Sequence, residues 1–503
     1  MADSMSYKLD LSDLERDGDV SITQQLVDRF SAAIEGGQLE PGSKLPPTRE
    51  LAAEAGVNHL TAARVYRKLA ELGYVTAQVG RGTFVRTLAP AGSAAHGDDW
   101  QVYALPPDDI SYSEQVLADS FSLAGREEVI SLAVGWPSPS NYPTRELAAI
   151  TADVFEQVGG EALSYLPAEG LFELREELAA RGRKYGWAED PDDIVITSGA
   201  QQAIALSAHA ILEPGDVAVV ESPTFIGMMT AMRATGARVI GVPVDEHGLD
   251  VDALERLLAR HEVKMVGLQS ACQNPTGRSI SEARRARLAE LAVERNFFML
   301  EDRVYADMHF EGRVVRPLRE LAPAHVIYAN SLSKVVGGGL RSGWIAARGA
   351  VRERIAMLKL EADFHSPTLI QHIAARWLAT GAYERHVAGT IPFYRERRDA
   401  LMAALERHLP GEYHADPPEG GHHLWVTLAR PLDERALYAE AARCGVAFTP
   451  GGAVTAERRS QTSFRLSFSL LDPEELDEGV RRLARAIREV RRRSRHSVAA
   501  PMS

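Results

Sequence analysis

Residues 331–344 read SLSKVVGGGLRSGW, and this stretch decides the fold of most of the chain. It follows the apolar run VIYAN (326–330), which predicts a buried strand, so Lys334 comes just after a strand end. The Lys334 amine can form a Schiff base with an aldehyde, and Arg341 can neutralise an anion beside it. Two hydroxyl groups that can hold the same anion belong to Ser331 and Ser333. The stretch therefore predicts a site for a small molecule that carries both an aldehyde and a phosphate.

Strand-like runs alternate with helical patterns on both sides of this stretch, from about residue 116 onward. The apolar runs are DIVIT (193–197), VAVVE (217–221), VKMVGLQ (263–269), FFMLED (297–302) and VIYAN. Strands that alternate with helices predict an α/β fold with a parallel-rich, doubly wound sheet covered on both faces. From about residue 392 the pattern changes to long helices with shorter strands around LWVTL and FRLSFS, which predicts a smaller C-terminal α/β lobe.

Other predicted strand ends carry side chains that suit the same molecule. Asp302 ends FFMLED, and a carboxylate there favours the protonated form of a ring nitrogen. Asn274, in NPTG, and Tyr305 can donate to a ring hydroxyl oxygen, and Phe225 can stack on the ring face. A helix start after DIVIT offers free backbone N–H groups to a phosphate, and its residues are Ser198, Gly199, Ala200 and Gln201.

An aldehyde, a phosphate, a ring nitrogen and a 3′-oxygen are the chemical features of pyridoxal phosphate, so we expect this cofactor. Arg465, in the short strand SFRLSFS, can grip a substrate carboxylate with two hydrogen bonds. Each motif alone also fits an ordinary turn, helix cap or surface residue. Their order along one chain is what indicates a cofactor site. Lys334 is the residue predicted to bind the cofactor covalently.

The first 86 residues have a different pattern. SITQQLVDRFSAAIEG (21–36) predicts an amphipathic helix that ends at Gly36. PPTRELAAEAG and HLTAARVYRKLAELG predict two more helices joined by a tight turn, with either Asn58 or Thr61 opening the third helix. YVTAQVGRGTFV predicts a β-hairpin. Helix, helix-turn-helix and wing is the predicted order, and 87–115 is expected to be a linker because Ala, Gly, Pro and Ser dominate its first part.

The distribution of charge favours nucleic acid as a partner of this small domain. The chain has a formal net charge of −13, which taken alone counts against DNA binding. Residues 41–86, however, contain seven Lys and Arg against three Glu. A helix in the major groove presents its first residues to base edges while flanking cations contact phosphates.

The segment PGSKLPPTRELAAEAGVNHLTAARVYRKLAELGYVTAQVGRGTFV resembles the winged-helix head of the GntR superfamily. The resemblance implies that Arg49 and Arg67 anchor the DNA backbone and that the wing residues Arg81 and Gly82 enter the minor groove. The implied recognition surface consists of Asn58, His59, Thr61 and Arg64. This chain has Asn58-His59 where the family commonly carries Ser-Arg, which removes the base contact expected from that Arg. A winged helix that binds protein through a solvated charged face is the alternative.

Residues 116–503 resemble fold-type I aminotransferases, including GWPSP around Gly135, SYLPAEGLFELREELA and PEGGHHLWV. The resemblance implies that Gly135 lies by the substrate carboxylate. It also implies that Tyr165 reaches the phosphate of a partner subunit, so that the pocket is complete only in a homodimer. A GntR-type head on such a body is the layout of MocR/GabR-type regulators. The expected domains are therefore 1–86, a linker at 87–115 and 116–503.

The function predicted from this resemblance is a regulator that binds double-stranded operator DNA and senses an amino compound or pyridoxal phosphate. A working aminotransferase on amino acid and 2-oxo acid pairs is the alternative, because every residue that such catalysis needs is present. A third reading is a scaffold that has lost the cofactor. Only two cysteines occur, without metal-ligand spacing, so neither a metal site nor a disulfide is expected. The sequence shows neither a signal peptide nor a long apolar run, and we expect a cytoplasmic protein without a membrane span.

Overall fold

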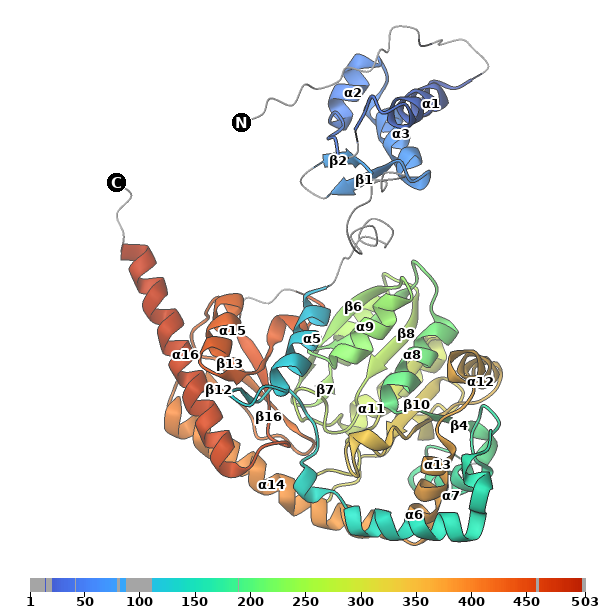
Figure 1. Ribbon diagram of the computed structural model, residues 1–503, viewed down its shortest axis with the longest axis vertical. Helices are drawn as coiled ribbons and strands as arrows, with labels where there is room; N and C mark the ends of the chain where they lie inside the picture. The colour runs from blue at the N-terminus through green and yellow to red at the C-terminus, as the bar shows by residue number, and fades with distance from the viewer. Residues whose placement is uncertain are drawn as a thin grey trace. The chain divides into compact units, whose positions relative to one another are not determined.

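The computed structural model divides the chain into two compact units, Met1–Asp109 and Ile110–Ser503 (Figure 1). The structure describes Leu14 and residues 20–40, 42–78, 82–86, 111–188, 190–457 and 461–499. Among these residues no helix is both long and apolar enough to cross a bilayer.

The N-terminal unit is a three-helix domain with a hairpin. Its elements are α1 (Ile22–Glu35), α2 (Thr48–Glu54), α3 (His59–Glu71), β1 (Val75–Gln78) and β2 (Gly82–Val85), and the two strands are antiparallel. Apolar side chains from all three helices form one core, because Leu26, Leu51 and Val65 are fully buried together. Asn58 is the residue that opens α3, since its Oδ1 accepts a hydrogen bond from the Thr61 amide at 2.7 Å. The predicted helix-turn-helix with a wing is confirmed, while the hairpin tip with Arg81 lies outside the described residues.

The C-terminal unit begins with a helix that linker composition did not predict. α5 (Tyr112–Ala124) starts inside the expected linker, whose earlier residues lie outside the described part of the chain. Ser111 and Glu114 form a capping box, in which each side chain bonds to the backbone N–H of the other. Val116 of α5 packs with Ile226 and Val454 in a small apolar cluster, which adds burial to the cap. Residues 112–115 of the expected linker are therefore helical.

An eight-stranded sheet forms the centre of this unit, in the order β4-β11-β10-β9-β8-β5-β6-β7. Its strands are β4 (Ile194–Thr197), β5 (Val217–Ser222), β6 (Arg238–Asp245), β7 (Gly248–Leu249), β8 (Val263–Leu268), β9 (Phe298–Asp302), β10 (Val326–Ser331) and β11 (Gly343–Ala346). The neighbours β6, β5, β8, β9 and β10 are paired in parallel, while β11 is antiparallel to both β10 and β4. The predicted parallel-rich sheet is confirmed.

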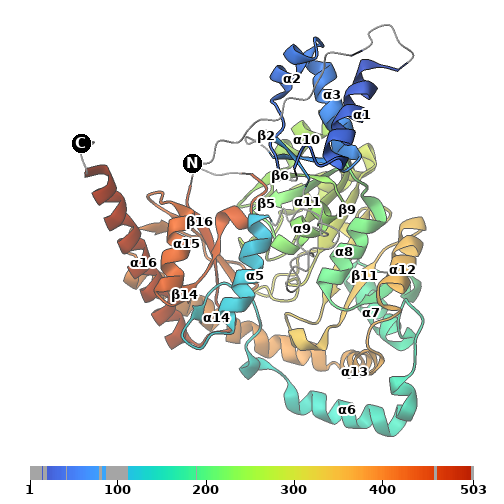
Figure 2. The ribbon, with the colours of Figure 1, turned by 45° about the horizontal axis from the view of Figure 1, so that its top comes forward.

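Helices cover both faces of this sheet because successive strand residues point to opposite sides. Ala218 and Val220 of β5 pack in one cluster with Ile204 and Met232, whereas Val219 packs in another with Leu288. The first face carries α8 (Ala200–Ile211), α9 (Ile226–Ala234) and α12 (Ala350–Asp363), and the second carries α10 (Val251–Leu258) and α11 (Glu282–Arg295). The strands and their covering helices can be followed in Figure 2.

A smaller lobe follows a long helix. α14 (Ala382–His408) packs against α16 (Pro473–Ala499), and the expected lobe start at about residue 392 falls inside α14 at Pro392. The lobe contains a four-stranded antiparallel sheet in the order β12-β13-β16-β15. Its elements are β12 (Tyr413–His414), β13 (His423–Leu428), α15 (Glu434–Arg443), β15 (Thr449–Pro450) and β16 (Ser463–Ser467). The remaining elements are β3 (Ile130–Ser131), α6 (Thr144–Val158), α7 (Phe172–Tyr185), α13 (Thr368–Ala379) and β14 (Val446–Ala447).

Candidate functional site

The carboxyl ends of parallel strands bring Lys334 and Asp302 to the same edge of the sheet. Asp302 is the last residue of β9, and Lys334 comes three residues after the end of the neighbouring strand β10. The Lys334 Nζ donates to the carbonyl oxygen of Gly135 at 2.9 Å and lies 6.0 Å from the centre of the Tyr305 ring. Three residues predicted from separate motifs therefore lie around the Lys334 amine.

Asp302 is almost fully buried, and its carboxylate is held by two hydrogen bonds. Gln269 Nε2 donates to Oδ2 at 2.6 Å and the Val304 amide donates to Oδ1 at 3.3 Å. Burial raises the pKa of Asp302 to about 6, although both donors and the nearby Lys334 favour the charged form. A cationic ring nitrogen beside this carboxylate would favour its charged form further. Gln269 is a functional residue that our sequence analysis missed, although it is the last residue of the run VKMVGLQ.

The Lys334 amine lies in surroundings that disfavour its charged form. The side chain is half-buried, and the loss of water around the amine lowers the pKa of Lys334 to about 8. The positive charge of Arg465 acts in the same direction, and Asp302 opposes it. A neutral amine is the nucleophile that an aldehyde requires, so the pocket prepares Lys334 for that bond.

Arg465 of β16 is buried and contacts another predicted residue, Asn274. Its Nη1 donates to Asn274 Oδ1 at 3.0 Å, and its Nη2 donates to Thr449 Oγ1 at 2.9 Å and to the Ala133 carbonyl. Since Oδ1 accepts from Arg465, the amide nitrogen of Asn274 is left to donate elsewhere. Arg465 Nε is buried and has no hydrogen-bond partner among the described residues. An unpaired N–H on a guanidinium is a donor that a carboxylate ligand can take.

Tyr305 is buried in contact with two histidines that sequence reasoning did not assign. Its hydroxyl lies 3.0 Å from His423 Nε2, and the His422 ring packs edge-on at 5.2 Å between centres. His422 Nδ1 lies 3.3 Å from the Gly135 carbonyl, the same oxygen that accepts from Lys334. Burial lowers the pKa of His422 to about 3 and that of His423 well below its usual value, so both rings are neutral. The signal for them was present in the motif PEGGHHLWV.

Gly135 is placed where only a residue without a side chain fits. A Cβ atom added to Gly135 would lie 2.3 Å from Cε1 of His423, which is far closer than any normal contact. The backbone at Gly135 therefore approaches the histidine ring directly, and the Lys334 amine donates a hydrogen bond to the carbonyl of the same residue. This arrangement gathers Gly135, Lys334 and His423 at one point. That Gly135 lies beside a substrate carboxylate stays a prediction.

The start of α8 forms an anion-binding cradle next to Arg341. Gly199 is the residue before α8 and has φ +104°, a conformation that favours glycine. Arg341 Nη2 donates to the Ser198 carbonyl at 2.5 Å, and a Cβ on Gly199 would lie 3.1 Å from the same nitrogen. The helix start also includes Ala200 and Gln201, whose backbone N–H groups lie in its first turn. The cradle combines the N–H groups of a helix start with a guanidinium, which suits a phosphate dianion, although the Ser198 amide itself donates to Gln202 Oε1 at 2.8 Å.

The remaining predicted cofactor residues have structural neighbours but no tested role. Ser331 Oγ accepts from the Ser333 amide at 3.3 Å, which folds the backbone just before Lys334. Phe225 is the residue before α9, and Gln201 Nε2 donates to the Gly227 carbonyl in the first turn of that helix. The side chain of Tyr165 is 87% exposed. These assignments stay predictions.

The donor set fits pyridoxal phosphate. An amine, a buried carboxylate and a buried Arg with an unpaired Nε surround one point, and the anion cradle at α8 is joined to Arg341. Among the described residues no group of three or more His, Cys, Asp or Glu side chains could hold a metal ion.

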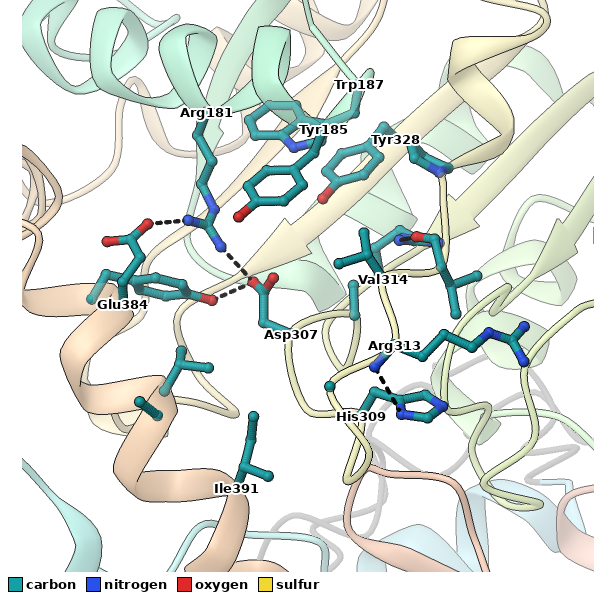
Figure 3. A pocket seen from close by; sticks show the side chains of 18 residues that line it. Arg181, Tyr185, Trp187, Asp307, His309, Arg313, Val314, Tyr328, Glu384 and Ile391 are labelled. Atoms are coloured by element: carbon teal, nitrogen blue, oxygen red, sulfur yellow. Dashed lines mark hydrogen bonds and ion pairs between the residues drawn. The ribbon is translucent and has the colours of Figure 1, made fainter.

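A separate cavity of about 270 Å³ lies between α7, α14 and the loop that follows β9 (Figure 3). Arg181 Nη2 lies 3.0 Å from Asp307 Oδ2, and the Tyr383 hydroxyl donates to the same carboxylate oxygen at 2.5 Å. Arg181 is also paired with Glu384 of α14. None of the predicted site residues is among the described residues that line this cavity, so the network ties α7 to α14 outside the cofactor pocket.

The N-terminal unit presents most of its predicted DNA contacts at the surface. Arg49, Asn58, His59, Arg64, Arg67 and Gly82 are exposed, and Thr61 is half-buried. The Oδ1 of Asn58 is engaged in capping α3, which leaves its amide nitrogen for a base. Sequence reasoning missed Leu60, whose side chain is 71% exposed in the first turn of α3. The sequence indication for Leu60 was that it is an apolar residue on the face of the predicted third helix that does not point into the core.

Comparisons with known proteins assign both units. Residues 127–483 match the family model "Aminotransferase class I and II", and residues 22–85 match "Bacterial regulatory proteins, gntR family". The chain is 35% identical over 380 residues to aromatic-amino-acid aminotransferase 1 of Thermococcus litoralis, covering 74% of this chain and 91% of that protein. It is 29% identical over 470 residues to the uncharacterized HTH-type transcriptional regulator YdcR of Escherichia coli, covering 93% and 99% respectively.

The solved structures agree with the fold and with the cofactor. The crystal structure of LysN, an alpha-aminoadipate aminotransferase from Thermus thermophilus complexed with N-(5′-phosphopyridoxyl)-L-leucine, has a TM-score of 0.69 and 33% identity. The likeness covers 75% of this chain and 95% of that one. Pyridoxal phosphate is therefore the cofactor of this pocket, and the resemblance to MocR/GabR-type regulators is confirmed in its two-part layout. The chain belongs to the class I and II aminotransferase family and carries a DNA-binding domain of the gntR family at its N-terminus.

Proposed function

We propose that this chain is a transcriptional regulator that binds operator DNA through α3 and the hairpin and senses an amino compound in the pyridoxal phosphate pocket. The observation that carries the proposal is the presence, in one chain, of an exposed polar and cationic α3 surface and a complete cofactor donor set. The regulator named above shares this layout over 93% of this chain.

In the body, Lys334 holds the cofactor covalently, while Arg341 and the α8 start hold its phosphate. When bound, pyridoxal phosphate supplies an electron-poor ring that is conjugated to the amino group of a ligand. Asp302 keeps the ring nitrogen protonated, and Asn274 and Tyr305 donate to the 3′-oxygen. Arg465 binds the carboxylate of an amino acid through its unpaired Nε. An amino compound without a carboxylate would leave that donor unused, so the pocket favours amino acids.

We infer that the pocket is completed by a second copy of the chain. Tyr165 and Phe364 are 87% and 66% exposed, and the ring of Tyr165 packs edge-on against His365 at 5.5 Å. The same segment borders the phosphate cradle, because Ser198 Oγ donates to Asp363 Oδ2 at 3.2 Å. Exposed aromatic side chains at the rim of an anion site are a surface that a partner subunit would cover. Tyr165 is then placed to reach the phosphate held by that partner.

Regulation requires that the amino compound bind two arrangements of the protein unequally. A coupling of about 1–3 kcal/mol between pocket and DNA affinity is the usual size of such an effect. Two heads in one dimer would favour an operator with two half-sites.

A working aminotransferase is the second candidate, and the intact Lys334, Asp302 and Arg465 arrangement favours it. Steady-state transamination with several amino donors distinguishes the two functions. The regulator proposal expects nanomolar to micromolar operator binding whose affinity shifts on addition of an amino acid, together with slow turnover. Fast turnover by a protein that does not bind the intergenic DNA beside its own gene would refute it.

Two variants, one in the DNA-binding domain and one in the cofactor pocket, test the two activities separately. Arg64→Ala should weaken operator binding and leave the visible absorbance of the bound cofactor unchanged, because Arg64 lies on α3. Lys334→Ala should abolish that absorbance and the response to the amino acid while basal DNA binding persists. Simultaneous loss of both properties in Arg64→Ala would show that the modules do not act separately.

A further inference from the structure

Tyr305 has one hydroxyl proton, and two acceptors would compete for it if the proposed cofactor is bound. The 3′-oxygen of the cofactor is one, and His423 Nε2, 3.0 Å from the hydroxyl, is the other. If Nε2 accepts the proton, Tyr305 cannot donate to the cofactor. The direction of the Tyr305–His423 hydrogen bond therefore decides whether Tyr305 performs its expected task.

The position of the proton on His423 sets that direction. A neutral imidazole carries a proton on one ring nitrogen only, and burial keeps His423 neutral. His423 Nδ1 lies 2.9 Å from Ser467 Oγ. If the serine hydroxyl donates to Nδ1, the ring proton must be on Nε2, which then donates to the Tyr305 oxygen. The hydroxyl proton of Tyr305 can then be donated to the cofactor.

The fold fixes the positions of Tyr305, His423 and Ser467 relative to one another. His423 of β13 is directly opposite Ser467 of β16 in the antiparallel register, so their contact follows from strand pairing. Gly135 admits the His423 ring, since any Cβ at that position would lie 2.3 Å from Cε1. The Tyr305 ring is buried and is approached edge-on by both histidine rings.

We propose that His423 and Ser467 are positioning residues that turn the Tyr305 hydroxyl toward the 3′-oxygen of pyridoxal phosphate. The anionic 3′-oxygen is a stronger acceptor than an imidazole nitrogen, so a bound cofactor selects the arrangement in which Ser467 donates to Nδ1 and Nε2–H donates to Tyr305. The inference rests on the pocket proposed above. It deepens that proposal, because the same chain of bonds would set how strongly Tyr305 donates to the 3′-oxygen of a bound cofactor.

The test uses the full-length, cofactor-loaded protein and the visible absorbance of the cofactor as a function of pH. This titration reports the proton on the nitrogen that joins Lys334 to the cofactor. A donor to the 3′-oxygen stabilises its anion after that proton leaves, so it lowers the titration midpoint. His423→Phe should raise the midpoint by about one pH unit, in the direction of Tyr305→Phe. Ser467→Ala should raise the midpoint by less than His423→Phe does. Without the serine hydroxyl, the proton of neutral His423 can lie on either Nε2 or Nδ1, and only the Nε2–H tautomer donates to Tyr305.

Two further variants control for packing. Ser463→Ala removes a hydroxyl from the same strand as Ser467, one that hydrogen-bonds Thr427 instead of His423, and should leave the midpoint unchanged. His423→Gln keeps an N–H group for Tyr305 and should restore most of the wild-type midpoint. The double variant Tyr305→Phe/His423→Phe should shift no further than Tyr305→Phe alone, since both act on one donor.

The outcomes separate this inference from the proposed function. A shift in Tyr305→Phe with none in His423→Phe, or a shift in Ser463→Ala equal to that in His423→Phe, overturns the positioning role while the cofactor pocket stands. Absence of any visible band that depends on Lys334 overturns both. Nitrogen NMR of the imidazole provides an independent readout, since a proton found on Nδ1 of His423 in the loaded protein contradicts the inference even if a variant folds poorly.

Discussion

At the scale of single residues, the lowered pKa of Lys334 has a consequence for how fast the cofactor binds. Only the neutral amine attacks an aldehyde, and the pKa of about 8 makes half of the amine neutral near that pH instead of near 10.5. The rate of cofactor association with the cofactor-free protein should therefore rise with pH and level off above about 8. Stopped-flow absorbance at several pH values measures it.

Asp302→Asn provides the control for this profile. Asp302 raises the pKa of Lys334, so its removal should move the rate profile to lower pH. At Lys334 the folded chain holds fewer protons than the unfolded chain between about pH 8 and 10.5, so the unfolding free energy of the cofactor-free protein should rise with pH over that interval relative to that of Lys334→Ala. A profile still rising at pH 10 would mean that the amine is not desolvated.

The site residues that the sequence predicted lie at strand ends, whereas those that it did not predict support them through side-chain contacts. Lys334, Asp302 and Asn274 follow predicted strands, and the parallel arrangement of those strands is enough to bring them together. Gln269 acts behind Asp302, and Ser467 acts behind Tyr305 through His423. Such supporting contacts depend on side-chain directions and on the register between strands of the small lobe, which periodicity does not specify.

At the scale of elements, α3 combines two kinds of surface that predict two kinds of DNA contact. Arg67 is an exposed cation, and Leu60 is an exposed apolar side chain in the first turn. Arg67→Ala should weaken binding to all sequences alike and reduce the slope of log affinity against log salt by about 1, as expected for one phosphate contact. Fluorescence anisotropy at several salt concentrations measures both quantities.

Leu60→Ala is the matched variant on the same helix. An apolar side chain in the major groove contacts the methyl group of thymine, so Leu60→Ala should lower operator affinity by about fivefold and leave the salt slope unchanged. Binding to non-specific DNA should not change. A reduced salt slope in Leu60→Ala would show that the helix had moved instead of losing one apolar contact.

Element boundaries show where local sequence signals sufficed. α1 ends at Glu35, just before the predicted stop at Gly36, and α3 begins after Asn58, one of the two starts that the sequence left open. α5 was missed because the surrounding composition is that of a linker, while its capping box and the burial of Val116 stabilise a helix there. The packing of Val116 against the body of the domain therefore stabilises a helix that begins in a segment whose composition predicted a linker.

At the scale of the whole molecule, the proposed dimer divides each cofactor site between two chains. Lys334 belongs to one chain, and the exposed Tyr165 would come from the partner. Tyr165→Ala and Lys334→Ala should each impair cofactor binding, the first by loss of a phosphate donor and the second by loss of the covalent bond. A mixed dimer of the two variants then contains one site with both residues intact and one site with neither.

Co-expression with two different affinity tags isolates that mixed dimer. It should bind one cofactor per dimer with wild-type affinity and give half of the wild-type visible absorbance, whereas each parent homodimer should fall short of this. Because the intact site forms only if Tyr165 crosses to the other chain, complementation cannot arise from two independent subunits. If the mixed dimer binds no better than the average of its parents, Tyr165 does not complete the partner's site, and its exposure must serve another contact.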